Sequence, residues 1–256
     1  MRKLIWVSCF LTALFGYFTL PCSQAQVQKV VIDAGHGGKD PGCLGAVSHE
    51  KDIALSISLK LGELINRHLP SVQVEYTRKT DVFVPLSKRA RMANKIGSDL
   101  FISIHCNAHS LSDKHGTETF VMGSSSSKSN LKVAMRENSA ILKEANYQSK
   151  YEGFNPKSAV SYILLSNYQT TQQSGSISLA GKVERHFQQY TLRNSRGVKE
   201  SGFWVLAKTG MPSILIETGF LTNPEEEQYL NSEKGQWMVA ASIYRAFRDY
   251  REELSR

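Results

Sequence analysis

Histidine and glutamate side chains end three separate apolar runs of the sequence. His36 follows the first run inside a glycine-rich stretch, His105 ends the second, and Glu217 ends the third. Apolar runs bounded by glycine or polar residues are typical of buried strands. The carboxyl ends of strands in an α/β sheet lie together and form its usual ligand site. We therefore expect these three residues to meet at one edge of a sheet, with the glycines leaving His36 uncovered.

A further carboxylate is expected beside them. Glu50 begins a segment in which Ile53, Ile57 and Leu61 recur at helical spacing, so it lies in the first turn of a helix. Two imidazoles and one carboxylate suit zinc and leave a coordination position for water. A hydrolase also needs a carboxylate to take a proton from that water. Glu50 and Glu217 can fill these two roles, and the residue types alone do not decide which fills which.

Other catalytic signatures are missing from the sequence. His49-Glu50 has no second histidine at the spacing of a helical zinc-protease motif, and no Gly-x-Ser-x-Gly elbow occurs. The stretch 35–40 fits neither a dinucleotide fingerprint nor a phosphate-binding P-loop. The formal net charge is +8, but the basic residues are scattered, so nucleic acid is not indicated as a partner.

The chain is long enough for one domain, since it has 256 residues of which 41% are hydrophobic. Strand-like and helical segments alternate, which predicts an α/β sheet with helices on both faces. We expect a short strand at 203–206. We also expect a short basic helix at about 86–96, with Arg89 near solvent.

The N-terminus has the pattern of a secretory signal. Basic residues precede the apolar run 4–20, and Ser23-Gln24-Ala25 supplies a cleavage site, which predicts a signal peptide at 1–25 and a mature domain at 26–256. Two alternatives are disfavoured: a membrane anchor, and a lipoprotein acylated at Cys22. No transmembrane segment is expected after signal removal. Cys43 and Cys106 remain in the mature chain, and their state is left open.

Five separated motifs resemble one known family. They are the segment 32–42, Glu50, Thr77-Arg78, the segment 103–108 and the segment 216–223. Together they resemble the zinc-dependent N-acetylmuramoyl-L-alanine amidases of bacterial cell walls, and the resemblance runs from about residue 30 to the last predicted helix. It implies a single domain with a twisted, mostly parallel sheet of about six strands.

The resemblance also implies an activity. His36, Glu50 and His105 would bind one zinc ion per chain, and Glu217 would be the catalytic glutamate. The substrate would be peptidoglycan, cut between the lactyl group of N-acetylmuramic acid and L-alanine during wall remodelling and daughter-cell separation. Export to the periplasm of a Gram-negative bacterium is the expected location. The alternatives are a zinc peptidase acting within stem peptides and a wall-binding module that has lost catalysis.

Two further residues are candidates for substrate binding. Asn107 follows the second apolar run, where an asparagine more often makes a turn hydrogen bond. Arg78 has a planar fork that suits a carboxylate of the stem peptide, but pairing with Asp81 is the favoured interpretation.

The segment 131–170 is polar, irregular and too long for an ordinary connection. Cell-division members of the resembled family carry an insertion here, whose helix covers the zinc cleft until an activator protein displaces it. We expect an autoinhibitory insertion, with Glu137 or Glu144 occupying the free zinc position.

Overall fold

The computed structural model describes residues 26–125, 127–168 and 172–255. The predicted signal peptide, including Cys22, lies outside these residues. None of the helices within them is both long and apolar enough to cross a membrane.

A sheet of six strands forms the centre of the molecule, in the order β2-β1-β3-β6-β4-β5. The strands are β1 (Lys29–Ala34), β2 (Gln73–Tyr76), β3 (Leu100–Asn107), β4 (Thr117–Met122), β5 (Ser195–Ser201) and β6 (Ser213–Phe220). β1, β2, β3 and β6 run parallel, whereas β4 is antiparallel to β6 and β5 is parallel to β4. The predicted mostly parallel α/β sheet is confirmed.

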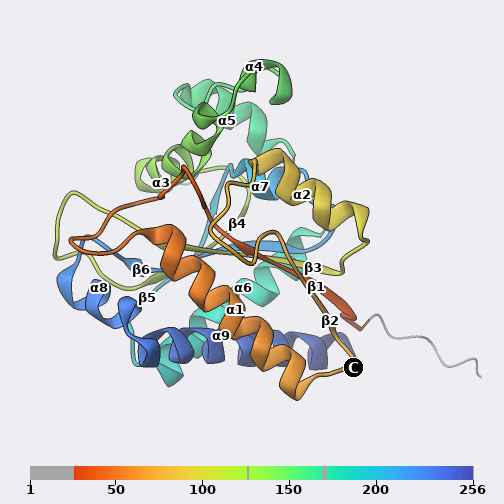
Figure 1. The fold of residues 1–256 in the computed structure, drawn as a ribbon. Coiled ribbons are helices and arrows are strands. Elements are labelled where there is room, and N and C mark those ends of the chain that lie inside the picture. The colour runs from red at the N-terminus through yellow and green to blue at the C-terminus, as the bar shows by residue number, and fades with distance from the viewer. Residues whose placement is uncertain (1–25, 126, 169–171, 256) are drawn as a thin grey trace, which may run out of the picture.

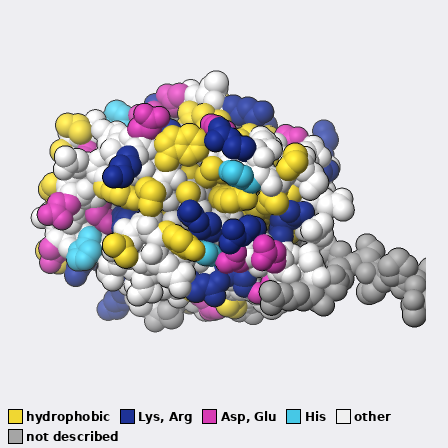
Figure 2. Space-filling view, turned by 90° about the horizontal axis from the view of Figure 1, so that it is seen from below, with side chains coloured by type: hydrophobic (Ala, Val, Ile, Leu, Met, Phe, Trp, Pro, Cys, Tyr) yellow, Lys and Arg dark blue, Asp and Glu magenta, His cyan; other side chains and the backbone are white. Residues whose placement is uncertain are grey.

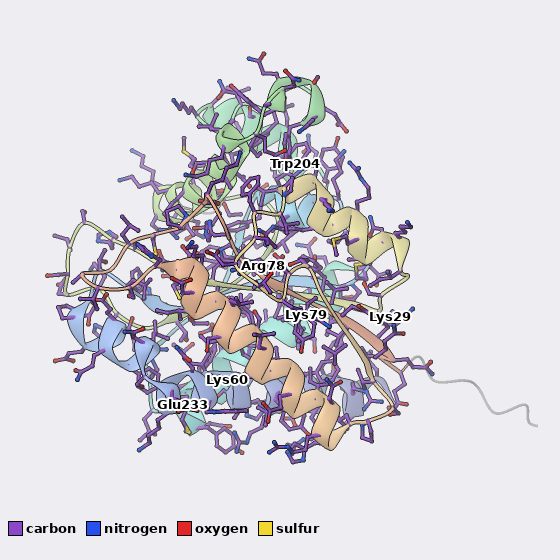
Figure 3. All side chains as sticks on the ribbon, in the orientation of Figure 1. Lys29, Lys60, Arg78, Lys79, Trp204 and Glu233 are labelled. Carbon is purple, nitrogen blue, oxygen red and sulfur yellow. The ribbon has the colours of Figure 1, made fainter. Side chains whose placement is uncertain are left out.

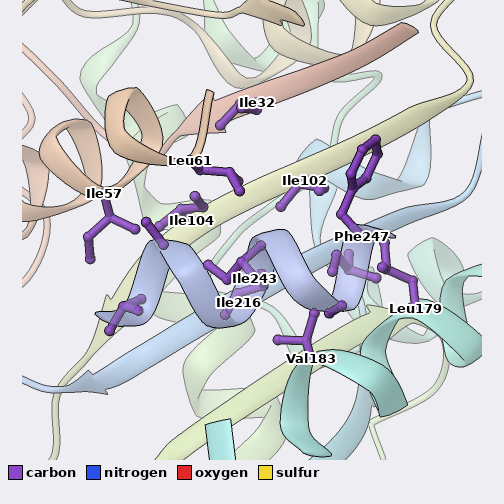
Figure 4. Close-up of a cluster of buried hydrophobic side chains, with 14 of the residues drawn as sticks. Ile32, Ile57, Leu61, Ile102, Ile104, Leu179, Val183, Ile216, Ile243 and Phe247 are labelled. Atoms are coloured by element: carbon purple, nitrogen blue, oxygen red, sulfur yellow. The ribbon is translucent and has the colours of Figure 1, made fainter. Parts of the chain in front are cut away.

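Three long helices cover one face of the sheet (Figure 1). They are α1 (Glu50–His68), α6 (Gln173–Tyr190) and α9 (Glu233–Leu254). Figure 4 shows Ile102 and Ile216 of the sheet packed with Leu61, Val183 and Phe247 of these helices, all fully buried. Burial of such side chains stabilises the fold by roughly 1.5–3 kcal/mol each. Seen from below, basic side chains form several separate groups among hydrophobic and acidic ones, rather than one stripe (Figure 2).

The second face carries shorter helices. α2 (Leu86–Lys95) and α7 (Trp204–Ala207) lie over it together with α3 (Lys128–Asn138), a 3₁₀ turn (Ser139–Lys143), α4 (Tyr147–Lys150) and α5 (Ala159–Ser166). Phe101, Phe120 and Leu215 point to this side because successive strand residues alternate between faces. The remaining helix, α8 (Pro224–Asn231), is capped by Asn223, whose side chain accepts hydrogen bonds from the backbone N–H groups of Glu225 and Glu226.

Two sequence predictions about the second face are wrong. The segment 203–206 is not a strand, because helix α7 starts at Trp204. The edge strand is instead β5, which was missed because its polar sequence SRGVKES lacks an apolar pattern. Arg89 is not near solvent but 1% exposed, because Arg89 Nη1 lies 2.8 Å from a carboxylate oxygen of the equally buried Asp33.

The predicted insertion forms an ordered excursion, which we call the α3–α5 segment (residues 128–166). It begins at Lys128 rather than at Leu131. Tyr151 and Phe154 of this segment pack against Trp204, with ring centroids 5.0 and 5.2 Å from the indole. Val133 and Ala134 of α3 belong to the same second hydrophobic core, so α3 is packed on this face of the sheet.

Candidate metal centre

Four buried side chains converge at the carboxyl edge of the sheet. His36 follows β1, His105 lies in β3, Glu50 is the first residue of α1, and Glu137 lies in the last turn of α3. One potential ligand atom from each lies within 4.8 Å of all the others. The structure therefore brings together the three residues expected as metal ligands and adds Glu137, one of the two autoinhibitory candidates.

The distances within this cluster suit a cation. His36 Nε2 lies 3.0 Å from Glu50 Oε1 and 3.0 Å from Glu137 Oε2. His105 Nδ1 lies 3.0 and 2.9 Å from the same two oxygens. His36 Nε2 and Glu137 Oε2 are buried, and neither has a hydrogen-bond partner among the described residues. Buried polar atoms that lack any partner are rare in proteins. Two carboxylates and two imidazoles fit a divalent metal ion, which would satisfy these atoms.

The outer nitrogen of each imidazole has its own partner. His36 Nδ1 lies 2.8 Å from Asp40 Oδ2 and donates to it. The Ser103 hydroxyl donates to Asp33 (2.7 Å), so it is left to accept from His105 Nε2 (3.1 Å). When the rings are neutral, these partners fix the tautomers that leave Nε2 of His36 and Nδ1 of His105 with lone pairs toward the cluster. Such second contacts are usual around metal-binding histidines.

Charges within the cluster shift the pKa values of its members. Burial lowers the pKa of His105, but Glu137 and Glu50 outweigh it and raise the pKa to about 9. Burial raises the pKa of Glu50, but His36 and His105 outweigh it and hold the pKa well below its usual range. The metal-free cluster therefore keeps its carboxylates ionised and its histidines protonated, and a bound metal ion would displace those protons.

The loop after β1 is shaped to hold His36 and to admit His105. His36 itself has a φ of 56°, in the left-handed region that costs energy for a residue other than glycine. A Cβ on Gly35 would lie 2.4 Å from His105 Cε1, so glycine is needed there for the ring to approach. The expectation that these glycines leave His36 uncovered is wrong, because His36 is 6% exposed.

Two buried arginines support the same loop. Arg78 donates to the carbonyl oxygens of Ala34 (3.0 Å) and Gly35 (2.7 Å), and Arg89 donates to those of Ala34 (2.6 Å) and His36 (2.6 Å). In Figure 3, Arg78 lies where β1 ends and α1 begins, whereas Lys29 marks the opposite end of β1. Arg78 is therefore placed as a support of the loop, with its donors turned to backbone oxygens. Asp81 pairs with Lys51 instead.

Glu217 lies beside the cluster on the neighbouring strand. Its Cα is the register partner of that of His105, and the residue is fully buried. Glu217 Oε1 accepts a hydrogen bond from Arg136 Nη2 (3.1 Å), whereas Oε2 makes none within the part of the chain that the structure describes. Burial raises the pKa of Glu217 to about 8, although Arg136 opposes the shift. A carboxyl group with such a pKa can take up and return a proton near neutral pH.

The remaining candidates take other positions. Asn107 Oδ1 accepts from the backbone N–H of Ala108 (2.8 Å), as a turn asparagine does, and from Arg136 (2.9 Å). Glu144 is not brought to the cluster, because its carboxylate accepts a hydrogen bond from Tyr151 Oη. Cys43 and Cys106 are both buried and both free thiols.

Sequence reasoning did not single out Arg136. Its guanidinium donates from Nε to Glu137 Oε1 (2.8 Å) and from Nη1 to Asn107, in addition to its contact with Glu217. No local pattern marks this residue, because its partners Asn107 and Glu217 lie on β3 and β6 and are set by tertiary packing.

A mostly parallel α/β domain with a buried His/Glu cluster and an acid of raised pKa at its carboxyl edge has the features of a metal-dependent hydrolase. The family model for N-acetylmuramoyl-L-alanine amidase matches residues 30–249, and the chain belongs to that family. It is therefore an enzyme, a peptidoglycan hydrolase that cleaves the amide bond between N-acetylmuramic acid and L-alanine.

Individual relatives agree with this assignment. The chain is 30% identical to the amidase AmiA of Escherichia coli K12 over 217 residues, covering 84% of this chain and 73% of AmiA. A crystal structure of an N-acetylmuramoyl-L-alanine amidase from Clostridium difficile 630 matches with a TM-score of 0.65 and 29% identity, covering 88% of this chain and 97% of that one. The CwlD amidase of Clostridioides difficile, solved in complex with the GerS lipoprotein, matches with a TM-score of 0.65 and 26% identity, covering 87% and 98%.

Proposed function

We propose that the enzyme uses zinc, held by His36, Glu50 and His105, with Glu137 in the fourth position. The observation that carries this proposal is the convergence of four ligand atoms within 4.8 Å, two of which are buried without a hydrogen bond. Nitrogen and oxygen ligands of this kind suit zinc among the common divalent ions.

Glu217 is the proposed catalytic residue. A bound zinc ion polarises an amide carbonyl and lowers the pKa of water to about 7. Oε2 of Glu217 has no hydrogen-bond partner in the described ranges, so it is the oxygen that takes the proton of the attacking water and returns it to the leaving nitrogen of L-alanine. Asp40 and Ser103 keep the two imidazoles oriented throughout.

Metal analysis of the purified mature chain tests the metal site. We expect about one zinc ion per chain, and loss of both zinc and hydrolysis in the His36→Ala variant. Full zinc content in that variant would show that the ion binds elsewhere.

We further propose that α3 keeps the enzyme inactive. Glu137 occupies the position that water needs, and Arg136 holds the proton acceptor Glu217. The end of α3 is fastened to the domain by Asn138, which donates to the Gly202 carbonyl (2.9 Å) and accepts from Trp204 N (2.9 Å). Activity then requires α3 to move away from the cluster.

An activator protein is the proposed cause of that movement. The CwlD amidase in complex with GerS shows that a similar enzyme can bind a protein partner. We propose that this chain is exported after removal of residues 1–25, acts in the periplasm of a Gram-negative bacterium, and contributes to daughter-cell separation. Residues 26–256 would form the catalytic domain, with the α3–α5 segment as its regulatory insertion.

The Glu137→Ala variant tests the inhibitory role of α3. Zinc should be retained by the three other ligands, and release of stem peptides from purified wall should rise without any activator. Glu152→Ala is the matched control, because Glu152 is an exposed glutamate of the same segment, paired with Lys208. Equal rates for wild type and Glu137→Ala, both with zinc bound, would refute autoinhibition by this residue.

A further inference from the structure

Gln26 becomes the first residue of the chain once residues 1–25 are removed, and it lies at a pocket far from the metal centre. The pocket has a volume of about 330 Å³. Residues just before β1, β3 and β6 line it together with the end of α9, which lies beside the start of β1 (Figure 1). Its apolar side chains include Met211, Pro212, Tyr250 and Leu254. The new N-terminus therefore forms at a partly apolar pocket on the amino edge of the sheet.

The backbone directly after Gln26 is fixed to the domain. Val27 is buried, and its carbonyl oxygen accepts a hydrogen bond from Arg251 Nε (2.9 Å). The backbone N–H of Gln28 donates to Asp99 Oδ2 (2.8 Å). Gln26 itself is exposed, and within the described part of the chain neither its backbone nitrogen nor its side-chain amide makes a hydrogen bond. After cleavage, its amine and its carboxamide are both free to react while Val27 holds them at the pocket.

The surroundings of Gln26 disfavour an ammonium group. Arg251 is 7% exposed and pairs with no carboxylate among the described residues. Asp99 is the carboxylate among the described lining residues, and its Oδ2 already accepts from the backbone. An α-ammonium group would add a second positive charge near Arg251 and would lose part of its hydration in the pocket. A neutral group at this position avoids both penalties.

An N-terminal glutamine can form such a neutral group from its own atoms. The amine nitrogen attacks Cδ of the side-chain amide and closes a five-membered lactam. The bond from Cδ to Nε2 breaks, and the nitrogen leaves as ammonia with a proton from the amine. This step needs no oxidant, reductant or second substrate, and its product, pyroglutamate, removes the terminal charge.

We propose that the mature chain carries pyroglutamate at position 26, with the lactam ring placed against the pocket between the start of β1 and the end of α9. This inference rests on the removal of residues 1–25 that is part of the proposed function. The ring closes the N-terminus to aminopeptidases and leaves Arg251 without a neighbouring positive charge.

The intact mass of the exported, purified chain tests the modification. It should be about 17 Da below the mass of residues 26–256, because one ammonia is lost. Sequential N-terminal degradation should fail, since no free amine remains. Gln26→Ala should show no mass loss and should be degraded from its first residue. Gln28→Ala is the matched control, because Gln28 is an exposed glutamine two residues further on, and this variant should lose ammonia as the wild type does.

Thermal unfolding of the same proteins tests the placement of the ring. Gln26→Ala keeps its ammonium group near Arg251, so its melting temperature should be about 1–3 °C below that of the wild type. Gln28→Ala should melt with the wild type. Equal melting temperatures for Gln26→Ala and the wild type would overturn this placement.

The intact mass also separates this inference from the proposed processing. A chain of residues 26–256 that keeps its full mass and a free amine would overturn the modification alone. A chain that starts at another residue would overturn both the modification and the proposed cleavage site. Wall hydrolysis is measured separately, so neither result bears on the amidase activity.

Discussion

The guanidinium of Arg136 lies 3.1 Å from the carboxylate of Glu217, and the next residue along α3 places its own carboxylate between the two imidazoles. One turn of α3 therefore contacts both the proposed metal ligands and the proposed proton acceptor. In the proposed inhibited state, Glu137 takes the coordination position that water needs, and Arg136 contacts Glu217 while orienting Glu137 through Nε. That state would rest on coupled charges rather than on steric coverage alone.

This coupling predicts a non-additive pair of variants. Arg136→Ala and Glu137→Ala should each raise wall hydrolysis by roughly 10-fold or more, because each removes a charged contact of about 1.5–3 kcal/mol that favours the closed state. The double variant should gain less than the product of the single gains, since both residues hold the same helix. Rates of hydrolysis of purified wall by the wild type, the two single variants and the double variant measure this coupling, with Arg248→Ala as a surface control. A strictly multiplicative double variant would argue against coupling.

Glu217→Gln separates metal binding from proton transfer. The amide keeps the size of the side chain but cannot take a proton, so zinc content should be unchanged while hydrolysis falls about 10²–10⁴-fold. The comparison is best made in the Glu137→Ala background, where the site is open. Turnover that survives this substitution would remove Glu217 from the mechanism.

Gly35→Ala should disable the site without touching a ligand. Its Cβ would lie 2.4 Å from His105 Cε1, so the ring must move out of the cluster and zinc affinity should fall by about 10–100-fold. Gly181→Ala is the control, because a Cβ on Gly181 of α6 meets no atom within 4 Å. Competition with a zinc chelator measures both variants, and equal affinities would contradict the packing argument.

Asp33 makes fold stability depend on pH. Burial raises its pKa, but Arg89 and hydrogen bonds from Thr77 and Ser103 outweigh burial and lower it below the usual value of 3.8. The ionised form therefore stabilises the fold above about pH 4, and this contribution is lost as pH falls through the lowered pKa.

Asp33→Asn should accordingly reduce the free energy of unfolding at pH 7 by about 3–5 kcal/mol, because it leaves Arg89 buried without its counter-charge. The difference from wild type should shrink below about pH 4. Urea unfolding of metal-free protein measures this, with the exposed Asp113→Asn as control. A difference that stays constant with pH would show that the charge of Asp33 is not the cause.

The sequence located the ends of the strands that carry His36, His105 and Glu217, because buried strands of a parallel sheet read as apolar runs. Parallel strands then bring those ends to one edge, so the cluster followed from local patterns and one rule of topology. The family resemblance led us to expect Glu137 or Glu144 at the free zinc position. The sequence did not distinguish the two, and in the structure the carboxylate of Glu144 accepts a hydrogen bond from Tyr151 instead.

Long-range polar contacts were beyond such reasoning. Arg89 was expected near solvent, yet it pairs with Asp33 across 56 residues of sequence. Asp33 interrupts an apolar run, and that interruption is the signal that a buried partner exists. Arg136 gave no signal, since its partner Glu217 lies 81 residues away in the sequence, on strand β6. β5 was missed because a polar edge strand lacks the apolar pattern of a buried one.

Product analysis with the Glu137→Ala variant tests the account most directly. Purified peptidoglycan is digested in H₂¹⁸O and the products are analysed by mass spectrometry. The account predicts faster release than by wild type, intact stem peptides with a free L-alanine amine, and ¹⁸O in the lactyl carboxylate of the glycan. Shortened peptides with ¹⁸O in a peptide carboxylate, or no gain over wild type, would contradict it.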